Sequence, residues 1–247
     1  MLEPLQFRRS SRSDCCEPDV RTPESAANLN LLDSRAIGRA SCFAQRFMRP
    51  GTYAYNVVPG YGQALCSDHP FRVVVSENKG KEMAQHNILV RDASAGFDVD
   101  TPEIAIKTGD MVLWSGNGRT TAPFAVAGDQ EFFNSHRMVN ECGYSHAFGT
   151  PGEYRWVDAF GSGLGGTIVV NDVKASDAKA LAKWTRQLSQ GSLVMIAGGK
   201  VDNKKVEVVV GQTVFFAIVT SPGISITDER LVDVRKPPVT GKKVKAA

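Results

Sequence analysis

Two short sequence patterns each occur twice in this chain of 247 residues, and the repetition restricts the folds that it can adopt. The first pattern, Pro-Gly-x-Tyr-x-aromatic, lies in 49–60 and again in 150–161, each time shortly after a phenylalanine. The second, in 104–126 and 206–226, runs from alternating apolar and polar residues through a Gly-polar turn into an aromatic strand and a proline. Repetition of supersecondary patterns indicates duplicated structural units. We therefore expect two similar domains.

Most of the chain reads as short, Val-rich strands separated by turn residues, and one segment, 175–191, reads as a helix. Ser176 is a suitable N-cap for this helix, Gly191 is suited to end it, and Leu181, Trp184 and Leu188 fall on one face. The chain is 42% hydrophobic and 22% charged, which is enough apolar content for a packed core. Many strands with one helix predict an all-β fold of Greek-key sandwiches.

The order of the repeats suggests a particular domain organisation. The two patterns follow one another in the middle of the chain, whereas the remaining two copies lie near opposite ends. We expect 84–173 to form an intact domain and 41–78 to combine with 193–235 into a split one, because either half alone leaves unpaired edges. Residues 1–40 are then an extended arm, 175–191 a helix buried between the two sandwiches, and 236–247 a basic tail.

The middle segment resembles a cupredoxin of the plastocyanin/amicyanin type over about 85 residues. The resemblance is carried by KTGDMVLW at 107–114, APFAV at 122–126, SHAF at 145–148 with PGEY at 151–154, and GTIVV at 166–170. It implies two cupredoxin-like sandwiches, one of them the split domain.

At the positions where the family has its copper ligands, this chain has none of the family's ligand residues. A blue-copper site needs two imidazoles, a thiolate and a weak axial thioether. The positions that correspond to ligands are Phe124, Asp158, Gly161 and Leu164 in the middle segment, and Val57, Gly60 and Gly223 in the other copy. We therefore expect no metal and no cofactor at these vestigial positions.

Two alternatives remain beside a copper-free structural role. The first is a metal or redox function of Cys15, Cys16, Cys66 and His69, although five cysteines at these spacings match no zinc pattern. The second is a small-molecule site at the glycine-lined loop ends, 116–124 and 158–165. The chain shows no nucleophile elbow, phosphate loop or zinc-protease motif, so we expect no enzymatic activity.

Charge and hydropathy bear on partners and location. A net charge of +3 gives no argument for nucleic acid, and no apolar segment is long enough to span a bilayer. The N-terminus lacks the apolar region of a signal peptide, so we expect a cytoplasmic protein. A position at the periphery of a membrane complex is compatible with this location. The expected partners are proteins of a larger assembly that contact the N-terminal arm and the basic tail, in which Lys242, Lys243 and Lys245 lie. The alternative for the basic tail is contact with an anionic membrane surface. Because cupredoxin-like domains occur in respiratory and photosynthetic complexes, the resemblance favours an accessory subunit of an electron-transfer complex.

Overall fold

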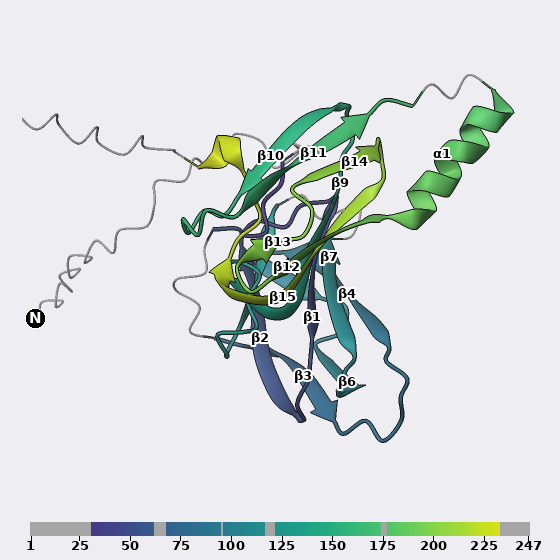
Figure 1. Ribbon diagram of the computed structural model, residues 1–247. Helices are drawn as coiled ribbons and strands as arrows, with labels where there is room; N and C mark the ends of the chain where they lie inside the picture. Colours follow the sequence, from purple (N-terminus) through teal and green to yellow (C-terminus); the bar gives the residue numbers. More distant parts are fainter. Residues whose placement is uncertain (1–30, 62–67, 95, 117–121, 174–176, 233–247) are drawn as a thin grey trace, which may run out of the picture.

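The computed structural model describes residues 31–61, 68–94, 96–116, 122–173 and 177–232. Within these ranges, sixteen strands form three sheets, accompanied by one α-helix and one short 3-10 turn, Glu229–Leu231 (Figure 1). The prediction of an all-β sandwich architecture with a single helix is confirmed.

The first eight strands form one sandwich, which we call the first unit. Its two layers have the spatial orders β1-β7-β4-β5 and β6-β3-β2-β8. The strands are β1 (Ser41–Arg46), β2 (Gly51–Pro59), β3 (Phe71–Ser76), β4 (Gln85–Ala93), β5 (Gly96–Val99), β6 (Glu103–Lys107), β7 (Met111–Gly116) and β8 (Phe124–Gly128). Alternation explains them: in β3 the side chains of Phe71, Val73 and Val75 are buried and those between them are less so.

The last eight strands form the second unit with the same order. Its layers are β9-β15-β12-β13 and β14-β11-β10-β16. The strands are β9 (Met138–Ala147), β10 (Gly152–Val157), β11 (Gly165–Asn171), β12 (Ser192–Ala197), β13 (Lys200–Val201), β14 (Lys205–Val209), β15 (Thr213–Ile224) and β16 (Thr227–Asp228). Each strand of the first unit thus has a counterpart eight strands later.

Hydrogen bonds at matching places support the equivalence of the two units. The amide of Gly109 donates to the carbonyl of Phe47 at 2.8 Å, and that of Gly211 donates to the carbonyl of Phe148 at 2.9 Å. Both glycines have positive φ, 93° and 82°, a conformation that favours glycine in these turns. The repeated Pro-Gly-x-Tyr pattern also has one structural meaning, because the Tyr53 and Tyr154 hydroxyls both donate to the carbonyl four residues earlier.

The expected split domain is wrong. Among the described strands, β2 and β3 of 41–78 pair with β8 and β6, not with strands of 193–235. Correspondingly, β10 and β11 pair with β16 and β14, so 84–173 is not an intact domain. Each closing hairpin therefore combines with the strands that follow it in the chain. Both arrangements satisfy the same hydrophobic pattern, which is why the pattern alone does not distinguish them.

The two units share one continuous sheet of eight strands, in which β1 pairs with β9 (Figure 1). Phe43 lies directly opposite Tyr144, its counterpart, so an approximate twofold axis passes between them. Opposed residues of an antiparallel pair point to the same side. Phe43 stacks on Trp114 of the first unit, and Tyr144 contacts Phe216 of the second. Both four-stranded sheets therefore cover the same side of the central sheet, and neither covers its other side.

Two short segments exchange places between the units. The first arm, 32–36, precedes β1 but bonds to the second unit: Ser34 N donates to Ile226 O at 2.9 Å, and Ile226 N donates to Ser34 Oγ at 3.1 Å. The second arm, 133–137, precedes β9 but bonds to the first unit through Ser135 and Val126, with both distances 3.0 Å. Within the described part of the expected N-terminal arm, residues 32–36 are thus built into the fold of the second unit.

Helix α1 (Ala178–Gln190) does not lie between the sandwiches as expected. None of its residues is buried, and in Figure 1 it stands out at one side of the second unit. Trp184 anchors it by donating from Nε1 to the carbonyl of Val210 at 3.0 Å, whereas Leu181 is 49% exposed. The N-cap is Asp177, whose side chain accepts from the amide of Ala180, while Ser176 lies outside the described residues. Gly191 ends the helix as predicted.

Candidate functional site

The vestigial copper positions separate into two groups, one in each unit. In the first unit Phe124 pairs with Pro59, and the amide of Gly60 donates to the carbonyl of Pro123 at 2.9 Å. Phe124 therefore belongs with Val57 and Gly60, although we expected it beside Asp158. It is fully buried against the ring of Phe97, with ring centroids 6.0 Å apart. Carbon side chains fill this loop end, so it offers no copper donors.

In the second unit, Asp158 is the one potential ligand among these positions, and backbone groups surround its carboxylate. Oδ1 accepts from the amides of Ser225 and Phe160 at 2.9 and 3.1 Å, and Oδ2 accepts from the amide of Ser162 at 3.0 Å. The side chain is 5% exposed. These bonds fix the loop that contains Gly161 and Leu164, and they leave the carboxylate with a structural role.

The register corrects one further assignment. Tyr55 lies opposite Gly128, and its counterpart Trp156 lies opposite Asp228, so Gly128 and Asp228 are equivalent. Phe124 and Ile224 each lie four residues earlier, so Ile224, not Gly223, is the residue equivalent to Phe124. Ile224 is also fully buried. Because the loop ends at 116–124 and 158–165 fall in different units, they do not combine into the single small-molecule site that the sequence suggested.

The described residues show no interaction that supports a metal or redox function of Cys15, Cys16, Cys66 and His69. Cys15, Cys16 and Cys66 lie outside the described residues, and His69 is partly exposed. Burial raises the pKa of Cys42 and raises that of Cys142 to about 12, so both described thiols stay protonated near neutral pH. Within the described ranges, no three His, Cys, Asp or Glu side chains come close enough to hold a metal ion.

Asp110 and Gln212 are structurally important residues that the sequence reasoning missed. The Asp110 carboxylate accepts from the amides of Ala84 and Lys107 at 2.7 and 3.0 Å and contacts His86 Nε2 at 3.1 Å. Burial alone would raise the pKa of Asp110, but these hydrogen bonds outweigh it and lower the pKa. Gln212 occupies the same turn of the second unit and accepts from the amide of Val209 at 3.1 Å. The shared position after the turn glycine was the available signal.

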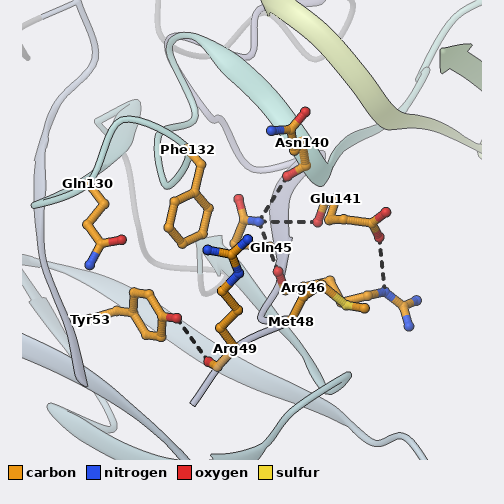
Figure 2. A pocket seen from close by; sticks show the side chains of 9 residues that line it. All are labelled: Gln45, Arg46, Met48, Arg49, Tyr53, Gln130, Phe132, Asn140 and Glu141. Carbon is orange, nitrogen blue, oxygen red and sulfur yellow. Dashed lines mark hydrogen bonds and ion pairs between the residues drawn. The ribbon is translucent and has the colours of Figure 1, made fainter. Parts of the chain in front are cut away.

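A cavity of about 350 Å³ lies where the two units meet, at the end of the β1–β9 ladder (Figure 2). Buried Gln45 donates from Nε2 to the carbonyls of Arg46, Asn140 and Glu141 at 3.0, 3.1 and 3.3 Å. Its Oε1 has no donor among the described residues. Glu141, near the start of β9, has a φ of 50°. At this bend the carbonyls of Asn140 and Glu141 both point at the amide of Gln45. This geometry joins the units, so we assign it a structural role.

The side of the central sheet that none of the described elements covers is the most distinctive surface. Paired residues across six strands form two rows on that side, and we call these twelve residues the outer face. The first row is Leu193, Phe215, Ser145, Cys42, Ser115 and Leu89, and the second is Met195, Ala217, Gly143, Ala44, Leu113 and Asn87. The approximate twofold axis relates one row to the other.

The outer face carries no charged side chain. Leu193, Met195 and Leu89 are 52%, 39% and 40% exposed, and Val219 continues the apolar surface along β15. At the centre, the ring of Phe215 packs against Gly143 and leaves no room for a larger residue there, because an added Cβ would lie 2.5 Å from the ring. On the water-exposed face of an antiparallel sheet, the side chains are normally polar, and they alternate along each strand with the apolar side chains that face the core. Three polar residues, Ser145, Ser115 and Asn87, interrupt the outer face, and an otherwise apolar surface that spans both units is typical of an interaction surface.

The described part of the chain contains no helix with the length and apolarity needed to cross a bilayer. The expected contacts through 1–30 and the basic tail lie outside the described residues. No family model, curated protein or solved structure matches the chain.

Proposed function

We propose that this protein is a copper-free, cupredoxin-like accessory subunit that binds a protein partner through the outer face. The observation that carries the proposal is the pair of uncharged rows across the central sheet, with Leu193, Met195 and Leu89 exposed. Fully burying an exposed side chain of this kind is worth about 1.5–3 kcal/mol, and these three side chains, which are about half exposed, would each contribute roughly half of that. The loop ends support the copper-free part of the proposal, because buried carbon side chains fill one of them and backbone amides hold the carboxylate in the other. The resemblance favours an electron-transfer complex as the assembly.

The proposal is tested by charging the outer face in the cells that make the protein. In the double variant Leu193→Glu/Met195→Glu, two exposed apolar side chains become carboxylates, which are costly to bury at an interface. We expect the variant to sediment as a smaller species than the wild type in native extracts. Leu181→Glu is the control, because Leu181 is 49% exposed, between the values of Leu193 and Met195, but lies on α1.

The control should sediment like the wild type, and all three proteins should unfold at the same temperature. If the double variant keeps the sedimentation of the wild type, the outer face is not the surface that joins the assembly.

A further inference from the structure

We infer that the outer face binds the outer face of a second copy of this chain. This inference rests on the proposed use of the outer face and names the partner. The occupant follows from the shape of the surface, because a broad sheet face is covered most completely by another sheet, at a spacing of about 10 Å. The chain itself carries such a sheet, with the same lack of charge on both copies.

The area is sufficient for a weak to moderate dimer. Six strands at about 4.8 Å, each contributing about five residues at about 3.4 Å, present roughly 500 Å² per copy. Two copies then bury roughly 1,000 Å², the lower limit of a specific interface. Val219, 38% exposed on β15, adds apolar surface beside the two rows.

Charges near the outer face do not oppose self-association. The flanking strand positions bear both signs: Arg91 lies opposite Asp98 on β4 and β5, and Arg46 lies 3.8 Å from Glu141. Two copies can therefore approach without facing a patch of one sign. Ala44 is buried at the centre, so the accessible apolar surface lies on both sides of it, at Leu193 and Met195 in the second unit and at Leu89 in the first.

Sedimentation equilibrium of the purified full-length protein tests this inference. Between about 1 and 100 µM we expect a concentration-dependent rise to twice the mass of the chain, as suits an interface of this size. Leu193→Glu/Met195→Glu should raise the dimer dissociation constant by at least ~100-fold, while Leu181→Glu should leave it unchanged.

Methionine oxidation locates the contact on the same samples. Met195 should become protected as concentration rises, whereas Met83, 63% exposed in the segment before β4, should react equally at all concentrations and serves as the internal reference. A dimer that survives the double variant, or that leaves Met195 reactive, uses another surface and overturns the inference.

A chain that stays monomeric also overturns the inference. If Met195 then reacts fully, the face is free for a different protein and the proposed function stands. If it is protected, and deletion of residues 1–30 removes the protection, the chain covers its own face and the proposed function fails as well.

Discussion

Ser34 and Ser135 hold the two arms to opposite units, so alanine at each position tests the exchange of arms. In Ser135→Ala the amide of Val126 loses its acceptor, and in Ser34→Ala the amide of Ile226 does. All four residues have an exposed fraction of 0%, so water cannot replace the lost hydroxyl. Leaving one buried amide unpaired costs about 1–3 kcal/mol of unfolding free energy. Urea denaturation should show this loss for both variants, whereas Ser189→Ala on the exposed surface of α1 should change it by less than about 0.5 kcal/mol.

Hydrogen exchange shows where each variant loosens the fold. Ser34→Ala should speed exchange at Ile226, in the second unit, although Ser34 precedes the first unit in the chain. Ser135→Ala should speed exchange at Val126, in the first unit. If each variant instead loosens the unit that follows it in sequence, the exchange of arms is refuted.

Three further predictions concern the turn carboxylate, the strained residue and the loop ends. Asp110→Asn should lower the unfolding free energy by about 1–3 kcal/mol at pH 7. Because the native pKa of Asp110 is lowered, its stabilisation is present above the ordinary carboxylate pKa and is lost as pH falls through the native value, so urea titrations at pH 7 and pH 3 should show a smaller difference at pH 3. Glu141→Gly should leave the free energy of unfolding unchanged or raise it by up to about 1 kcal/mol in thermal denaturation, because glycine adopts the positive φ without strain. Loss of the ion pair with Arg46 should cost little, because this pair is long and partly exposed. A drop of more than about 1 kcal/mol would contradict the assignment of strain. Added Cu(II) should give no intense blue absorption, because the loop ends lack a thiolate; a blue product would contradict the placement of Val57 and Asp158 at the thiolate positions.

The sequence predicted individual elements well because local chemistry determines them. The glycine turns before β7 and β15 and the Pro-Gly-x-Tyr hairpins could be recognised from residue type alone, and the all-β sandwich architecture with one helix followed from them. Strand partners were not determined locally. The hairpin β2–β3 fits the strands of either unit by hydrophobicity, and only the three-dimensional path of the connections selects β6 and β8.

The candidate surface was also beyond the sequence reasoning. Leu193, Leu89 and Cys42 are far apart in the chain and look like ordinary strand residues, and their common side becomes visible only once the register of six strands is known. The arms did carry a signal: Asp33-Ser34 and Asn134-Ser135 precede the two Pro-Gly pairs by the same distance. The amphipathic stripe of α1 misled because a stripe shows which face packs but not against what.

The shared sheet is the feature from which the outer face and its proposed partner both follow, and backbone NOEs between β1 and β9 test it most directly. We expect cross-strand contacts between Cys42 and Ser145 and between Ala44 and Gly143, continuing from Ser145 to Phe215 of β15. Contacts that link 51–59 to 206–226, with none between β1 and β9, would restore the split domain and contradict the shared sheet.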